Sequence, residues 1–214
     1  MKYKESWIGT DESGKGDYFG PLVIAGVCLN QDIGEELLAL GIKDSKKMSD
    51  KKVLAMGPFI RQRALSAEVV VIGPEKYNEL YLKMKNLNTL LAWGHARVIE
   101  NILSKIDCPY ALTDQFGDKS LVEKALMSRG KEITLEQRPR AEEDIAVAAA
   151  SVLARGEFLS RLESLSGKEG TVLPRGASEQ VILTAKGFFK KKGIEGLGRV
   201  AKLHFKTTQA VLGK

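Results

Sequence analysis

A run of ten residues, Ile145–Ala154, is apolar at every position except Ser151. The run is about half as long as a helix that crosses a bilayer, so it does not predict a membrane span. A helix that is apolar on nearly every face must be covered on all sides by other elements. The sequence therefore predicts a buried helix over 145–159 at the centre of a layered fold.

The segments before this helix alternate between strand and helix patterns. The sequence predicts strands at 6–11, 21–29, 68–72, 110–113 and 133–135, and helices at 49–64, 87–102 and 118–128. Three strands in an antiparallel meander, followed by alternating helices and strands, are typical of an α/β fold with a mixed sheet flanked by helices. We expect one domain over 1–214, with a basic helical C-terminal region at about 155–214.

The positive charge of the chain is concentrated in this C-terminal region. Residues 155–214 carry 12 Lys and Arg against 5 Asp and Glu, whereas residues 1–154 carry 21 basic and 22 acidic residues. Such a region is either a solvated helical face or a surface that follows phosphates, and charge alone leaves both interpretations open. With 43% apolar and 28% charged residues, the composition excludes a disordered chain.

The N-terminal residues and the cysteines indicate a reducing compartment. No apolar signal region precedes the first predicted strand, and Cys28 and Cys108 lie in or beside apolar strand-like runs. Buried reduced thiols fit this pattern better than a disulfide does. We expect a cytoplasmic protein without a zinc site or a membrane partner.

Two adjacent acids, Asp11 and Glu12, end the first predicted strand, and the next residues are Ser13, Gly14, Lys15 and Gly16. The segment nearly matches a phosphate-binding loop, but a glycine replaces the required hydroxyl and the two acids would repel phosphates. Adjacent carboxylates suit a hard divalent cation such as Mg²⁺ instead. Consecutive strand residues point to opposite faces, so both acids can share a cation only if the glycine-containing loop bends the chain at once.

Two more acids stand at the ends of buried elements. Asp114 ends the strand at 110–113, where an isolated carboxylate needs a cation or a hydrogen-bond donor. Asp144 precedes the apolar helix, where the ordinary role of Asp is an N-cap. Four acids that converge would repel one another without metal, and nucleases use such sites to bind two metal ions.

The segment Asp11–Val23 resembles the signature of type 2 ribonucleases H, and specifically that of the bacterial ribonuclease HIII branch, since Lys15 stands where the HII branch typically has Arg. The resemblance covers nearly the whole chain, through motifs at 44–47, 86–93, 113–116, 146–155, 173–177 and 202–205. It implies a ribonuclease H-like mixed five-stranded sheet. It also implies a metal-dependent endoribonuclease that hydrolyses the RNA strand of RNA–DNA hybrids, leaving 3′-hydroxyl and 5′-phosphate ends.

The resemblance further implies the site residues. Two Mg²⁺ or Mn²⁺ ions would be bound, in the presence of substrate, by the four carboxylates Asp11, Glu12, Asp114 and Asp144. Because Glu142 and Glu143 adjoin Asp144, a one-residue shift would change the fourth ligand.

The implied substrate contacts are the loop residues Ser13, Gly14, Lys15 and Gly16, which would approach 2′-hydroxyls of the RNA strand. Lys46 and Ser151 are further candidates, with a solvated lysine and a serine bonded to its own helix as the ordinary alternatives. His95 and His204 are expected to be packed side chains.

Two alternatives remain open: a ribonuclease HII-like enzyme that cuts at single ribonucleotides in DNA, and a non-catalytic nucleic-acid-binding protein of the same fold. Ribonucleases HIII usually carry an additional N-terminal substrate-binding domain, whereas the first strand predicted here starts at Ser6. Either that domain is absent or this sequence is part of a longer chain, and we expect the basic C-terminal region to bind the hybrid duplex in its place. We expect a monomer without an obligate protein partner.

Overall fold

The computed structural model describes residues 5–43 and 45–213. They fall into two compact units. Unit 1 comprises the residues up to Glu12, Ile24–Val70 and Asn86–Gly156, and unit 2 comprises Ser13–Val23, Val71–Lys85 and the residues from Glu157 onwards. That the chain acts as one domain over 1–214 stays a prediction.

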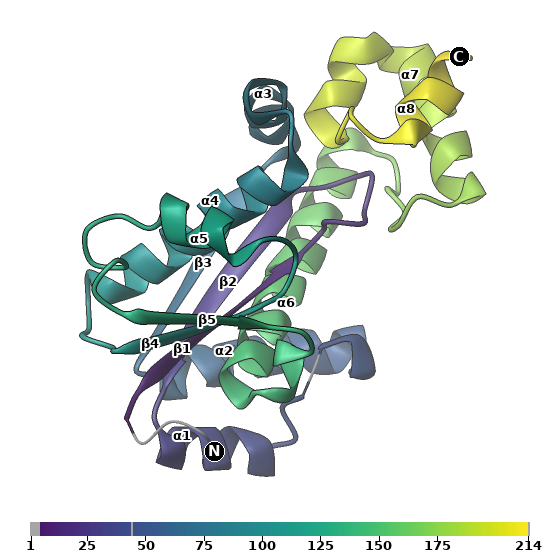
Figure 1. The fold of residues 1–214 in the computed structure, drawn as a ribbon. Helices are drawn as coiled ribbons and strands as arrows, with labels where there is room; N and C mark the ends of the chain where they lie inside the picture. Colours follow the sequence, from purple (N-terminus) through teal and green to yellow (C-terminus); the bar gives the residue numbers. More distant parts are fainter. Residues whose placement is uncertain (1–4, 44, 214) are drawn as a thin grey trace. The chain divides into compact units, whose positions relative to one another are not determined.

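The elements follow the predicted order and form a mixed five-stranded sheet with flanking helices (Figure 1). The strands are β1 (Trp7–Ser13), β2 (Leu22–Leu29), β3 (Ser66–Ile72), β4 (Tyr110–Asp114) and β5 (Thr134–Arg138). The helices are α1 (Gln31–Ala39), α2 (Asp50–Arg63), α3 (Pro74–Met84), α4 (Leu87–Leu103), α5 (Lys119–Ala125), α6 (Ile145–Glu169), α7 (Glu179–Val200) and α8 (Lys206–Leu212), with short 3₁₀ turns η1 (Ser45–Lys47) and η2 (Ala141–Glu143).

The strand order β3-β2-β1-β4-β5 places β1 at the centre of the sheet. β1 pairs in parallel with β4, with Gly9 opposite Leu112 and Thr10 opposite Thr113. β4 in turn pairs in parallel with β5. Because parallel neighbours end at the same edge, the acids that follow Thr10 and Thr113 leave the sheet side by side.

Gly9 allows the start of α6 to lie directly against β1. A Cβ atom built at Gly9 would stand 2.2 Å from both Ala146 C and Val147 N, far inside van der Waals contact. The first turns of α6 are buried accordingly, which confirms the predicted buried helix at the centre of the fold.

Two predictions of absence can be compared with the described residues. Cys28 and Cys108 are free and buried, as expected of reduced thiols. Within residues 5–43 and 45–213, no helix combines the length and hydropathy needed to cross a bilayer.

Helices α1, α3 and α6 show the largest differences from the sequence prediction. α1 and α3 were not predicted, although Asn30 Oδ1 caps α1 by accepting from Ile33 N at 3.0 Å and Pro74 opens α3. α6 continues to Glu169, ten residues beyond its predicted end. Since α6 loses its apolar character after the first turns, the hydrophobic pattern alone could not show where it ends.

The close contact at Gly9 gives a stability prediction. Gly9→Ala should lower the free energy of unfolding by at least about 3 kcal/mol, because its new methyl group meets helix backbone that cannot move aside. Gly167→Ala, in α6 where open space surrounds the position of the new Cβ, should raise the free energy of unfolding by about 0.5 to 1 kcal/mol. Urea unfolding of both variants checks this, and a Gly9→Ala protein as stable as wild type would contradict the packing described.

Candidate active site

The two acids at the end of β1 point to opposite faces of the sheet. Asp11 shares its face with Gly9 and is directed towards α6, where it is hydrogen-bonded to Ser151. Glu12 shares its face with Thr10 and is directed towards α4, where it meets His95. Side chains therefore alternate between the two faces of the sheet up to Glu12, and the loop does not turn Glu12 onto the face of Asp11.

Asp11 is a half-buried acid that lies next to a second acid, Glu12. Burial, and next the neighbouring Glu12 carboxylate, raise its pKa from 3.8 to about 7, while hydrogen bonds from Ser151 and from Glu12 N, and the charge of Lys46, oppose the rise. Asp11 Oδ1 accepts from Glu12 N at 2.8 Å. Positive charge nearby would stabilise the ionised form of this half-buried acid, and a bound cation would supply it.

Glu12 is positioned by a fully buried histidine. His95 Nε2 lies 3.3 Å from Glu12 Oε2, and its Nδ1 lies 2.7 Å from Thr10 Oγ1. The tautomer that donates from Nε2 lets Nδ1 accept from the Thr10 hydroxyl, so all three groups are satisfied. Phe116 stacks on the same ring at 4.9 Å between centroids. His95 is thus packed, as predicted, but packed against a predicted site residue.

Asp114 ends β4 beside the strand that carries Asp11. The register that pairs Thr10 with Thr113 brings Asp11 and Asp114 to neighbouring strand ends. Asp114 Oδ1 accepts from Ala141 N at 3.2 Å, so the turn η2 lies against this acid. The prediction that an isolated carboxylate at this strand end requires a donor or a cation is confirmed for the donor.

Asp144 is hydrogen-bonded to Trp7, the first residue of β1, and not to the acids near the other end of that strand. Its Oδ1 accepts from Ala146 N at 2.9 Å, as an N-cap of α6 does, and from Trp7 Nε1 at 2.9 Å. Ser151, which contacts Asp11, lies seven residues further along α6, or about 10 Å at 1.5 Å per residue. The structure therefore places Asp144 as a cap near Trp7 and shows no contact between it and Asp11.

The acids consequently do not form a preassembled metal cluster. Within the residues that the structure describes, no group of three or more His, Cys, Asp or Glu side chains is placed to hold one metal ion. The donor set nevertheless suits a hard cation, because Asp11 and Asp114 offer carboxylate oxygens at neighbouring strand ends and Asp11 is short of positive charge.

Ser151 and Lys46 both lie near Asp11. Ser151 is 3% exposed, and its hydroxyl lies 2.7 Å from the hydroxyl of Ser45, which is also buried. Lys46 is exposed, and its charge acts on Asp11. The predicted substrate contacts of both residues stay predictions. Asp44, the first residue of that motif, lies outside the described residues.

The predicted substrate loop Ser13–Gly16 belongs to unit 2. Gly14 has φ +87°, a left-handed conformation that favours glycine, and a Cβ there would stand 2.2 Å from Pro21 O. Lys15 is half-buried, and Gly16 is exposed with open space around its Cα. The loop thus has a fixed bend at Gly14 and room for close backbone approach at Gly16.

The residues after this loop are held by a fully buried lysine. Lys202 Nζ donates to the carbonyl oxygens of Asp17 and Gly20, both at 2.7 Å. Asp17 Oδ1 also accepts from Gly176 N at 2.7 Å. Burial lowers the pKa of Lys202 to about 7, and the charge of Asp17 opposes this shift. Two loops that the family resemblance singled out are therefore joined within unit 2.

The other predicted packing residue, His204, is stacked on Tyr81 with ring centroids 4.0 Å apart. In the basic region, Lys190, Lys191 and Lys192 are all exposed on α7, which bends at Gly193. Lys192 Nζ pairs with Glu169 at 2.5 Å. Part of the basic face is therefore already neutralised by the chain itself.

Two residues near the acids at the end of β1, His95 and Arg155, were not predicted as part of the site. His95 was assigned to packing because it lies in the long predicted helix beside Trp93, and nothing in the sequence spacing shows that it faces Glu12. Arg155 ends the motif at 146–155, and its partners lie 105 to 110 residues earlier in the chain. Only the fold brings them together.

Comparisons with known proteins agree with this architecture. The sequence profile of the family described as Ribonuclease HII matches residues 8–208. Ribonuclease HIII of Protochlamydia amoebophila is 47% identical over 97% of this chain and 68% of its own length, and that of Chlamydia pneumoniae is 44% identical over 94% and 68%. A crystal structure of Bst-RNase HIII in complex with Mn²⁺ superposes with a TM-score of 0.90 at 31% identity, covering 98% of this chain and 70% of that chain.

The fold and the acidic ends of β1 and β4 define a nuclease of the ribonuclease H type. The chain belongs to the ribonuclease HII family, and it is similar over nearly its whole length to proteins named ribonuclease HIII. These comparisons confirm the predicted fold and family, and with them a metal-dependent endoribonuclease. The chain spans about two thirds of the length of the relatives it matches.

The lysine at position 202 gives a pH prediction. Its pKa of about 7 in the folded chain lies below 10.5, its ordinary value, so between these values the unfolded chain binds the extra proton. The unfolding free energy of wild type minus that of Lys202→Met should therefore rise from pH 7 to 9.5, by up to about 1.4 kcal/mol per pH unit.

Urea unfolding of both proteins across this range measures the difference. The nearby charged or titratable groups Asp17, His204 and Tyr77 are common to both proteins, so their own titration largely cancels. A difference that does not change with pH would show that Lys202 titrates alike in the folded and unfolded chains.

Proposed function

We propose that this chain hydrolyses the RNA strand of RNA–DNA hybrids, using divalent cations held by carboxylates at the ends of β1 and β4. The observation that carries the proposal is the parallel pairing of these strands, which brings Asp11 and Asp114 to neighbouring strand ends. Family membership and the Mn²⁺ complex of Bst-RNase HIII support it.

Each residue of the site has a separate part in this proposal. Asp11 and Asp114 would hold the metal, with Glu12 and a fourth acid completing the set of four carboxylates. His95 fixes Glu12 from the α4 side, and Ser151 fixes Asp11 from the α6 side. When bound, Mg²⁺ or Mn²⁺ lowers the cost of generating the attacking hydroxide and offsets the charge on the leaving oxygen. The products would carry 3′-hydroxyl and 5′-phosphate ends.

The loop Ser13–Gly16 is proposed to select RNA. Its open backbone at Gly16 allows amide groups to approach a ribose 2′-hydroxyl, the group that distinguishes RNA from DNA. A non-catalytic binder of this fold is the main alternative. Retained acids argue against it, because a pure binder would gain affinity for phosphates by losing negative charge.

Replacing a metal-binding acid should separate catalysis from binding. Asp11→Asn and Asp114→Asn should each lower the cleavage rate at saturating Mg²⁺ at least about 100-fold, the effect of about 2.7 kcal/mol of barrier. Hybrid affinity without metal should be retained or improved, because each variant removes negative charge near phosphates. Rates above about a tenth of wild type would rule out the assigned role.

The fourth acid can be identified by the same assay. η2 lies against Asp114 and contains Glu142, whereas Asp144 caps α6 near Trp7. If Asp144 is the fourth ligand, Asp144→Asn should abolish cleavage and Glu142→Gln should not. The reverse result would move the role to Glu142. Thermal unfolding of both variants separates destabilisation by loss of the α6 N-cap from loss of metal binding.

Substrate preference tests the resemblance to the ribonuclease HIII branch. Lys15 is a flexible point charge, whereas arginine offers a planar fork, so we expect selection to require several 2′-hydroxyls along the strand. The enzyme should cut tracts of about four or more ribonucleotides efficiently and a lone ribonucleotide in DNA poorly. End-labelled duplexes at matched metal and salt measure both rates. Equal rates would favour the ribonuclease HII-like alternative, and cleavage of neither, the binder.

The basic region is proposed to supply affinity for the nucleic-acid backbone. Replacing Lys190, Lys191 and Lys192 with Gln should flatten the dependence of log K on log salt, by up to about 0.9 for each lysine that contacts a phosphate. Lys76→Gln with Lys83→Gln, two lysines that pair with Glu79, is the matched control. An unchanged slope in the triple variant would make α7 a solvated face.

A further inference from the structure

We propose that Arg155 is a positioning residue for the active site: it holds the turn Ser45–Met48 against α6 and thereby fixes the backbone that carries Lys46. The inference rests on the proposed function, because it assigns Lys46 a contact with the bound nucleic acid. It extends that function to a residue that touches neither the metal-binding acids nor the substrate loop.

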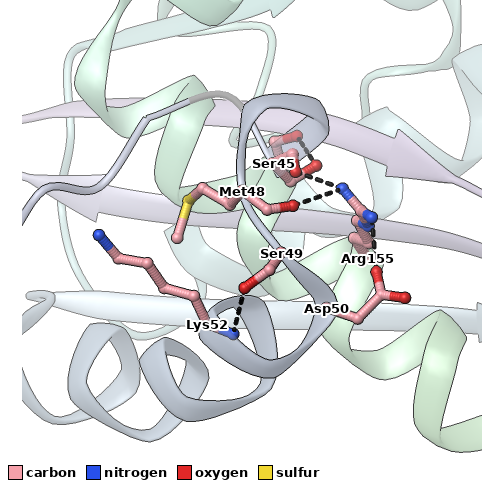
Figure 2. A network of polar contacts seen from close by, with 7 residues as sticks. Ser45, Met48, Ser49, Asp50, Lys52 and Arg155 are labelled. Carbon is pink, nitrogen blue, oxygen red and sulfur yellow. Dashed lines mark hydrogen bonds and ion pairs between the residues drawn. The ribbon is translucent and has the colours of Figure 1, made fainter.

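The guanidinium of Arg155 joins three groups of one short segment (Figure 2). Its Nη1 donates to Ser45 O and, at 3.4 Å, to Met48 O, while its Nη2 pairs with Asp50 Oδ1 at 2.5 Å. A planar guanidinium presents five N–H donors in a rigid fork and so holds such divergent acceptors in a fixed arrangement, whereas an ammonium is a point charge on a flexible stem. Arg155 thus binds both the turn and Asp50, the first residue of α2.

A second contact ties the same turn to the same helix. Ser45 Oγ lies 2.7 Å from Ser151 Oγ, and Ser151 is four residues before Arg155, one turn earlier on the same face of α6. Ser151 is also hydrogen-bonded to Asp11. The turn, α6 and the acid are therefore connected through successive contacts, which begin at Arg155 and end at the end of β1.

The side chain carried between these two contacts is Lys46. It is exposed, although Ser45 and Met48 on either side of it are buried. Its charge reaches Asp11 and favours the ionised carboxylate there. A lysine side chain is flexible, so its place relative to Asp11 depends on the backbone that carries it. That backbone is fixed by two contacts with the same face of α6, one at Arg155 and one at Ser151.

If this account is correct, Arg155 acts on cleavage through Lys46. Arg155→Met and Lys46→Met should each lower kcat/KM on a hybrid duplex about tenfold, mainly through KM if Lys46 contacts a phosphate. The double variant should be no slower than the slower single variant, because both changes remove the same interaction. Multiplying effects, about 100-fold in the double variant, would overturn the proposal.

Amide hydrogen exchange in the absence of substrate provides a readout independent of activity. Arg155→Met should accelerate exchange at 45–49, including Met48 N, which donates to Ser45 O at 3.1 Å. Lys46→Met should leave these rates unchanged, and Arg155→Lys should give intermediate rates. Arg63→Met, which removes an exposed arginine paired with Glu36, controls for loss of an ion pair elsewhere in unit 1.

The two readouts separate the proposal from the function on which it rests. Wild-type protein that cleaves hybrids, combined with unchanged exchange in Arg155→Met, would refute the positioning role and leave the proposed function standing. Wild-type protein that cleaves no hybrid would refute the proposed function, whatever the exchange rates. If Arg155→Met does not fold, Arg155→Lys supports both the cycle and the exchange measurement.

Discussion

The contact between Gly9 and the backbone at Ala146 and Val147 is the constraint on which the rest of unit 1 depends. Without a side chain at that position of β1, α6 lies directly on the central strand of the sheet. This proximity brings Ser151 to Asp11. It also allows two bonds between α6 and the turn that precedes α2, from Ser151 to the Ser45 hydroxyl and from Arg155 to Ser45 O. Any side chain at Gly9 would push α6 outward and loosen all these contacts together.

β1 distributes its two acids between two helices. Asp11 faces α6, where Ser151 and the charge of Lys46 favour its ionised form, while Glu12 faces α4 and is held by His95. Their mutual repulsion contributes to the raised pKa of Asp11. A site with this arrangement has affinity for positive charge before any ligand binds, and divalent cations relieve both the burial and the repulsion of the carboxyl groups.

The sequence predicted the elements whose pattern is local. The apolar run at 145–154 predicted a buried helix, and Ser49, the first residue of the helix predicted at 49–64, caps α2 by accepting from Lys52 N. β5 was predicted too short because Glu136, Gln137 and Arg138 carry no hydrophobic signal. β5 is an edge strand, and polar residues are common there. The sequence prediction ended a strand at residue 72 and placed no helix directly after it, although Pro74 stands at the first position of α3, where proline signals a helix start.

For the candidate site, spacing predicted which acids end strands but not which way they point. Whether Glu12 meets Asp11 or His95 depends on the helix packed on each face of β1. Likewise, Asp144 is both a plausible ligand and a good N-cap in sequence, and only the position of Trp7 across the sheet shows what its Oδ1 bonds in the folded chain. The role of Arg155 depends on partners more than 100 residues away and has no local signal.

The central claim is that the neighbouring ends of β1 and β4 form a divalent-cation site. Titration of the folded protein with Mn²⁺, followed by electron paramagnetic resonance of the free ion, measures it most directly. We predict that wild type binds Mn²⁺ and that Asp11→Asn and Asp114→Asn each weaken binding at least about tenfold, since each removes a carboxylate ligand. Equal Mn²⁺ affinity in wild type and both variants, with all three proteins folded by circular dichroism, would contradict the account.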